Sequence, residues 1–143
     1  VDGKLTVVDS TPVLDGPAIS VPKLDLPSLP QGPTKASPLG GLFGTRSGDK
    51  GPNANLGIFA RSEEAYVWLA EFLSTDRLKG LMPEADERRI DRYELPNLLS
   101  LNFIFHGLLE EGVAASTRQD PQAKALGEYL RAKVVEIPES LFP

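Results

Sequence analysis

The chain has 143 residues and a formal net charge of −5 at pH 7, and it contains no cysteine. The acidic balance argues against a general nucleic-acid binder, and the lack of cysteine excludes disulfides, thiolate metal sites and cysteine nucleophiles. No apolar run approaches the roughly 18 residues that cross a membrane, so we expect a cytoplasmic protein with neither a nucleic acid nor a membrane as partner. The chain begins with Val rather than Met, and we expect it to be a piece of a longer protein.

The first forty residues are rich in proline and contain no aromatic residue. Proline recurs at every fifth position, each time with an apolar residue two places later: Pro12, Pro17, Pro22 and Pro27, followed by Leu14, Ile19, Leu24 and Leu29. Proline fixes φ and removes a hydrogen-bond donor, so we expect an extended arm over residues 1–40 and a folded domain over 41–143. The arm could be a disordered linker, or its apolar residues could lie in a groove of a neighbouring domain or subunit.

The folded part begins with a predicted short strand over 41–45, then a polar loop over 44–55 and a buried strand over 55–61. Ser62 is a good N-cap with two glutamates behind it, and apolar residues follow at helical spacing, so we expect a helix there. Thr75 is the expected cap of a second short helix.

The second half is less clear. Residues 88–95 alternate and predict a strand with one solvated face. Residues 97–112 fit a capped helix by apolar spacing, although LNFIF could equally be a strand, and we favour the helix. We then expect a strand over 113–119, a helix from Asp120 to Lys133 that begins with an N-cap and a proline, and a strand over 134–138.

With the middle helix left out, this order is βαββαβ. The layout is that of a split-βαβ, ferredoxin-like fold. We therefore expect an α+β domain in which one helical layer and an extra helix pack on an antiparallel sheet. The other face of the sheet would need covering by the arm or a partner.

The stretch GTRSGDKGPNAN, residues 44–55, matches neither a Walker A loop nor a dinucleotide fingerprint. Gly48 and Gly51 permit positive φ, so the backbone N–H groups could form an anion nest. The side chains that could then contact a ligand are Arg46, Ser47, Lys50, Asn53 and Asn55. The alternative is a connection in which Asp49 and the asparagines satisfy the loop's own backbone, and spacing alone favours this alternative.

His106 is the only histidine in the sequence. On the predicted helix it shares a face with Asn102, four residues earlier, and it could shuttle a proton or contact a polar ligand. The alternative is a capped or surface histidine. Without a second His or a Cys it makes a poor metal site, and we expect neither a metal nor a cofactor.

Three stretches together, TRSGDKGPNANLGIFAR, RYELPNLLSLNFIFHGLL and GVAASTRQDPQAKALGEYL, resemble the C-terminal, ferredoxin-fold domain of the acyclic terpene utilisation (AtuA-like) family. The resemblance implies a ferredoxin-like domain that follows a larger N-terminal domain or works beside a separate partner subunit. The matching motif positions are Arg46, Ser47, Gly48, Asp49, Lys50, Gly51, Asn55 and Gly57, and Asn102, Phe103, His106 and Gly107. Pro52 and Glu110-Glu111 depart from the family's pattern.

The resemblance also implies a setting in the catabolism of acyclic terpenoids or branched acyl-CoA compounds. There we expect an accessory binding or assembly domain whose segment 44–55 contacts a partner domain or an acyl-CoA-like ligand. Two alternatives stay open: a contribution of Asp49, Lys50 and His106 to an active site completed by another domain or subunit, or a homo-oligomerisation module. The candidate site residues are Arg46, Ser47, Asp49, Lys50, Asn53, Asn55, Asn102 and His106.

Overall fold

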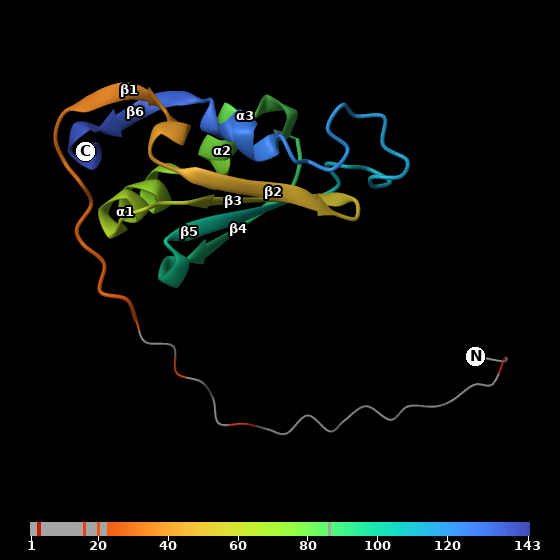
Figure 1. The fold of residues 1–143 in the computed structure, drawn as a ribbon, viewed down its shortest axis with the longest axis horizontal. Coiled ribbons are helices and arrows are strands. Elements are labelled where there is room, and N and C mark those ends of the chain that lie inside the picture. Colours follow the sequence, from red (N-terminus) through yellow and green to blue (C-terminus); the bar gives the residue numbers. More distant parts are fainter. Residues whose placement is uncertain (1–2, 4–15, 17–19, 21–22, 86) are drawn as a thin grey trace.

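The computed structural model describes residues 3, 16, 20, 23–85 and 87–143 (Figure 1). Within them lie a four-stranded antiparallel sheet, in the order β2-β3-β5-β4, and a two-stranded antiparallel sheet of β1 and β6. The strands are β1 (Thr34–Pro38), β2 (Gly44–Lys50), β3 (Asn53–Phe59), β4 (Ile90–Leu95), β5 (Ser100–Phe105) and β6 (Val134–Pro138). The α-helices of the described residues are α1 (Glu63–Phe72), α2 (Thr75–Leu81) and α3 (Leu126–Arg131).

The topology is that of a ferredoxin-like α+β domain, which confirms the expected fold class. Strands β3 and β4 are joined through α1 and α2, and both pair antiparallel with β5, which lies between them. This is the split βαβ unit. Strand β6 pairs with β1 outside this sheet, and β2 occupies the sheet edge beside β3.

One face of the four-stranded sheet forms the core. Alternate residues of β3 and β5 are buried, among them Leu56, Ile58, Leu101 and Phe103 at 0% exposure. Figure 1 shows the three helices and the β1–β6 pair on the side of the sheet that these residues face. Each such side chain contributes about 1.5–3 kcal/mol by leaving water, so the helical layer is held mainly by this face.

The start of α1 follows directly from the sequence. The Ser62 hydroxyl accepts a hydrogen bond from the Ala65 N–H at 3.2 Å, which satisfies one free donor of the first turn. The N-cap of α2 is Ser74, one residue before the predicted Thr75. The Ser74 hydroxyl accepts a hydrogen bond from the Arg77 N–H at 3.1 Å.

The predicted helix over 97–112 is wrong. Residues Ser100–Phe105 form strand β5 between β3 and β4, and only Pro96–Leu98 make a short helical turn. The apolar residues of this segment fit a period of two as well as a period of 3.6, and pairing on both edges favours the strand. The sequence feature that indicates a strand is LNFIF, which contains β-branched and aromatic residues.

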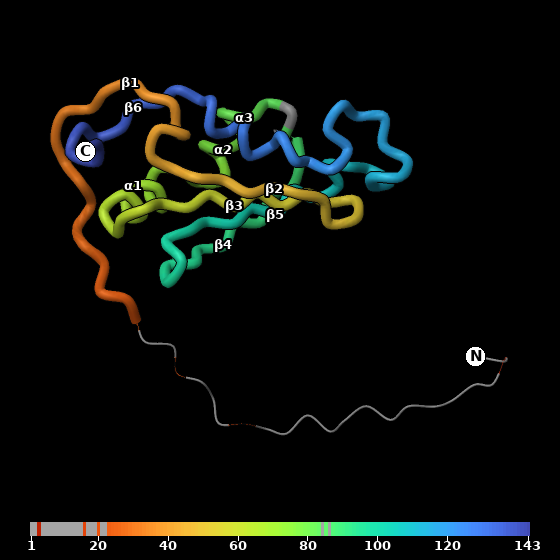
Figure 2. Tube along the Cα trace, in the orientation of Figure 1, coloured from red at the N-terminus to blue at the C-terminus, as the bar shows by residue number. Residues whose placement is uncertain are grey.

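The predicted strand over 113–119 is also wrong, and the following helix is shorter than expected. Figure 2 shows the chain between β5 and α3 as a long irregular excursion. The Asp120 carboxylate accepts from the N–H groups of Lys124 and Ala125 at 2.8 and 2.9 Å, and this closes a turn. Ala123 has a φ of 53°, which no α-helix allows, so α3 begins only at Leu126.

The described part of the Pro-rich arm lies on its own domain. Residues 23–29 lie beside α1, Leu26 packs against the core, and Thr34–Pro38 form β1, paired with β6. Leu24 and Leu29 thus line a groove of their own chain. The repeat members Pro12, Leu14, Pro17, Ile19 and Pro22 lie outside the described residues. The division of the chain at residue 40 stays a prediction.

Candidate functional site

The side of the four-stranded sheet turned away from the helices is called the open face here. No described segment covers it (Figure 1). Strand pairing sets its side chains in cross-strand rows: Gly44, Phe59, Ser100 and Leu95; then Arg46, Gly57, Asn102 and Tyr93; then Gly48, Asn55, Ile104 and Asp91. Lys50 pairs with Asn53 in the last row, and His106 and Arg89 lie beyond β5 and β4 at the same end.

The polar stretch 44–55 is a β-hairpin, so the predicted loop over these residues is wrong. Strands β2 and β3 pair from Gly44↔Phe59 to Lys50↔Asn53, and the turn is Gly51-Pro52. Gly51 has a φ of 61°, a conformation in which glycine avoids the steric cost of a side chain. Strand β2 consists of polar residues and two glycines, so neither of its faces is apolar and the sequence shows no alternation.

The alternation divides the candidate residues between the two faces. Six of the eight lie on or beside the open face: Arg46, Lys50, Asn53, Asn55, Asn102 and His106. Ser47 and Asp49 lie on the opposite face. The Ser47 hydroxyl accepts from the Gly127 N–H at 2.9 Å and donates to the Lys124 carbonyl at 3.2 Å, so its observed role is to fasten α3 to the sheet.

The centre of the open face is low and polar. The Asn55 side-chain amide donates to the Asn102 amide oxygen at 3.3 Å, and both side chains are half-buried. Gly48 and Gly57 lie beside this pair and add no side chain. This bond uses one N–H of Asn55 and the amide oxygen of Asn102. The amide oxygen of Asn55 and the NH₂ group of Asn102 can therefore hydrogen-bond a ligand.

Three cations stand around this centre. Arg46 and Lys50 are exposed on the open face. Lys124 reaches it over the sheet edge, because a Cβ added at Gly48 would lie 3.2 Å from its Nζ. Among the residues that the structure describes, none forms an ion pair with these three cations. The open face is therefore a basic surface on an acidic chain, which favours an anionic ligand.

His106 is held by a chain of charged side chains at the hairpin end. Its Nε2–H donates to Asp91 Oδ2 at 2.8 Å, and Arg89 donates to both Asp91 oxygens at 3.0 and 3.1 Å. The hydrogen bond from His106, and then that from Arg89, lowers the pKa of Asp91. Asp91 therefore stays ionised and orients the ring, which leaves the other ring nitrogen, Nδ1, to accept a hydrogen bond.

The backbone beside His106 is also fixed. Its N–H donates to the Arg89 carbonyl at 3.0 Å, and the Gly107 N–H donates to the Asn53 side chain at 2.8 Å. Arg88 donates to the Gly107 carbonyl at 2.9 Å. Asn53 thus acts on the site through Gly107, and the imidazole is placed by bonds on both sides of its residue.

The far end of the open face is apolar. The Phe59 ring lies so close over Gly44 that a Cβ there would come within 2.2 Å of it. Phe59, Leu95 and Tyr93 are 39%, 40% and 50% exposed. The open face therefore changes from charged at the hairpin end to apolar at the end near α1, an arrangement that suits a ligand or partner of mixed polarity.

Sequence reasoning missed Arg89, Asp91 and Lys124. The alternation of RIDRYEL could have placed Asp91 opposite the buried Ile90, on the same face as Asn102, had β5 been assigned as a strand. Nothing local identifies Lys124, because it reaches Gly48 only through the packing of α3 on β2. In residues 23–85 and 87–143, no three His, Asp or Glu side chains gather as metal ligands would.

Comparison with known proteins gave one match. The family model described as the AtuA ferredoxin-like domain matches residues 38–136. No curated protein and no solved structure matches the chain. Within the described residues, no helix combines the length and the apolar character that a bilayer crossing requires.

Proposed function

The chain belongs to the AtuA ferredoxin-like domain family, and on that premise we propose that it is an accessory binding domain of a protein in acyclic terpenoid or branched acyl-CoA catabolism. Its open face binds an anionic group, carried by an acyl-CoA-like ligand or by a larger partner domain or subunit. The metabolic setting rests on the family resemblance. The observation that supports the binding role is the uncovered sheet face with three cations around the Asn55–Asn102 pair.

Charge and shape favour this role over that of a structural sheet face. A merely solvated face needs no small residues at its centre, whereas Gly57 adds no side chain beside the amide pair and Gly48 leaves room for Lys124 Nζ to reach over the sheet edge. Arg46 can pair with a phosphate or carboxylate through two parallel hydrogen bonds, and Lys50 and Lys124 add point charges. The motif positions of the family thus supply two of the three cations, Arg46 and Lys50, and both glycines, whereas Lys124 lies outside them.

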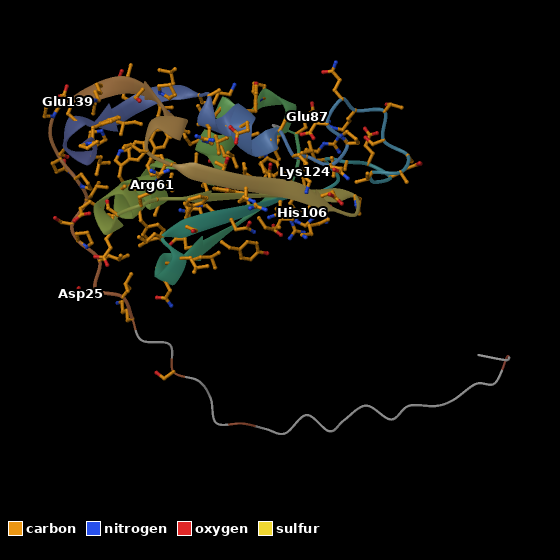
Figure 3. All side chains as sticks on the ribbon, in the orientation of Figure 1. Asp25, Arg61, Glu87, His106, Lys124 and Glu139 are labelled. Carbon is orange, nitrogen blue, oxygen red and sulfur yellow. The ribbon has the colours of Figure 1, made fainter. Side chains whose placement is uncertain are left out.

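A titration of the full chain with CoA and a short acyl-CoA tests the proposal. We expect amide shifts confined to β2, β3 and the hairpin end of β5, and weaker binding at higher salt. Arg46→Gln combined with Lys50→Gln is expected to abolish the shifts. Arg61→Gln removes one positive charge, as Arg46→Gln or Lys50→Gln does alone, and is the control for those single variants. Figure 3 places Arg61 near α1, away from Lys124 and His106. Lack of any shift at millimolar ligand would remove the ligand half of the proposal.

A second candidate function is favoured by the Arg89–Asp91–His106 chain. We propose as the alternative that the domain contributes His106 as a proton-transfer residue to an active site completed by another domain or subunit. An aspartate that orients an imidazole and stabilises its charged form is the arrangement by which histidine bases are prepared. Asp49, on the opposite face, takes no part in this alternative.

The two functions separate in the complete protein. If His106 transfers a proton, His106→Gln abolishes turnover of an acyl-CoA substrate but leaves CoA binding and the melting temperature unchanged. If the open face only binds, His106→Gln retains turnover. Light scattering on the same samples tests the third possibility, self-association through the open face, which would disappear in Phe59→Ser.

A further inference from the structure

A groove lies between the arm and the domain and shares no lining residue with the open face. It has a volume of about 650 Å3, is formed between residues 23–29 and α1, and is called the arm groove here. Leu24, Leu26 and Leu29 line it from the arm, and Tyr66, Val67 and Ala70 line it from α1. Its volume is within the roughly 300–1,000 Å3 of small-molecule sites, and such sites are mostly apolar with a few polar groups.

Tyr66 is the polar group that is not explained by the fold. The residue is 2% exposed, lies in the lining of the arm groove, and its hydroxyl makes no hydrogen bond within residues 23–85 and 87–143. The hydroxyl is not fully enclosed, so it opens onto the arm groove and can hydrogen-bond a molecule there. Burial, and next the nearby Glu94 carboxylate, raise the pKa of Tyr66. The phenol therefore stays protonated and can both donate and accept.

The charged groups of the arm groove are mainly acidic. Glu71 and Glu94 line it together with one cation, Lys23. Glu94 accepts from Arg92 at 2.6 Å, and Glu71 forms no ion pair within the described chain. These carboxylates oppose an anionic ligand and accept hydrogen bonds from a donor. The arm groove thus has the opposite electrostatic preference to the open face.

We propose that the arm groove binds a small apolar molecule that carries one hydrogen-bond donor, either a hydroxyl or an ammonium group. The apolar body lies among the leucines of the arm and the side chains of α1. The donor group meets Tyr66 and Glu94, which gives the tyrosine hydroxyl the partner it lacks. The arm closes the site from the outside, so its described part acts as one wall of a binding site.

Titration of the full chain with hexanol, hexylamine and hexanoate tests this site. The methyl signals of Leu24, Leu26 and Val67 report on it. We expect both donor-bearing molecules to shift these signals and hexanoate to bind more weakly than either. Binding by only one of hexanol and hexylamine identifies which donor group the site takes. Hexanoate binding as tightly as hexanol, or no shift with any of the three, would overturn the proposal.

Tyr66→Phe keeps the ring and removes only the hydroxyl, so the variant is expected to fold. It should weaken binding of the donor-bearing molecules about 2- to 12-fold, the value of one net hydrogen bond. Tyr129→Phe, on α3 and outside both the arm groove and the open face, is the matched control and should leave binding in the arm groove unchanged. Equal binding by Tyr66→Phe and the native chain would contradict the assigned role of Tyr66. Failure of CoA to bind the open face would leave these measurements unaffected.

Discussion

The open face and the arm groove lie on one small domain and are built in different ways. On the open face lie the alternate side chains of each strand that point away from the core, and many of them are polar. The arm groove is made by tertiary closure, because residues 23–29 fold back over α1. The first is basic and shallow, and the second is apolar with an acidic rim. One chain of net charge −5 therefore has one surface suited to an anion and another suited to an apolar molecule that carries a hydrogen-bond donor.

The largest expected effect compares two tyrosines. Tyr66→Ala removes a ring that is 2% exposed and leaves a cavity, so it should lower the free energy of unfolding by about 3–5 kcal/mol. Tyr93→Ala on the open face, 50% exposed in the native chain, should cost less than about 0.5 kcal/mol. Urea denaturation of both variants measures the difference. Similar losses would show that the open face is packed against something in solution.

The next effect tests how α3 is joined to the sheet. A Cβ at Gly127 would lie 2.6 Å from Thr45 Oγ1, and this glycine is buried. Gly127→Val should therefore destabilise the domain by about 1–3 kcal/mol through overpacking, and it should move Lys124 away from the open face. Gly80→Val is the control, because no atom lies within 4 Å of a Cβ added there. It should leave stability within about 1 kcal/mol of the native value, because there is space for the side chain and valine is a slightly better helix former than glycine.

A smaller effect separates two neighbours in β2. Ser47→Ala removes the acceptor of the Gly127 N–H and should cost about 1 kcal/mol of stability. Arg46→Gln should leave stability within about 0.5 kcal/mol of the native value, because its side chain is exposed. Thermal melting distinguishes them, with CoA titration as the second measurement. If Arg46→Gln proved the more destabilising of the two, the assignment of structural and binding roles in β2 would be reversed.

The smallest expected effect at neutral pH is that of two ionisable side chains, Asp91 and Tyr66. Their contributions to stability change only at low and at high pH, respectively. The folded-state pKa of Asp91 is lowered, so its contribution is complete above the usual aspartate pKa of about 4 and is lost as pH falls through the lower folded value. The folded-state pKa of Tyr66 is raised, so its contribution is complete below about pH 10 and is lost as pH rises further.

Stability of the native chain, Asp91→Asn and Tyr66→Phe across the pH range measures both. We expect Asp91→Asn to flatten only the acid limb and Tyr66→Phe only the alkaline limb. An acid limb unchanged by Asp91→Asn would contradict the hydrogen-bonded chain to His106. An alkaline limb unchanged by Tyr66→Phe would show that the hydroxyl is not desolvated.

These comparisons also show what the sequence could and could not reveal. The start of α1 was predictable because Ser62 makes its capping bond within four residues. The α+β, ferredoxin-like fold class was predictable, but the strand that lies between β3 and β4 was assigned as a helix. Asn102 and His106 were correctly placed on one face for a wrong reason, because residues four apart share a face in a strand as well as in a helix.

The remainder depends on contacts between distant residues. The polar strand β2 has no apolar alternation of its own, and its pairing with β3 fixes which of its side chains reach the open face. Lys124 joins that face from beyond residue 120, and Leu26 joins the core from the arm. Local propensity carries no information on such contacts, so the acid rim and the volume of the arm groove could not be predicted.

The pairing of β1 with β6 has a mechanical consequence. The strands are antiparallel, with Thr34 opposite Pro138 at the end where the arm enters. A force that lifts the arm away from α1 therefore acts first on the Thr34–Pro138 pair. The pairs of β1 with β6 then separate one after another. Such peeling needs less force than shearing the whole strand at once. The arm can thus be pulled off its groove by separating the β1–β6 pairs before the force reaches β2, the next strand along the chain.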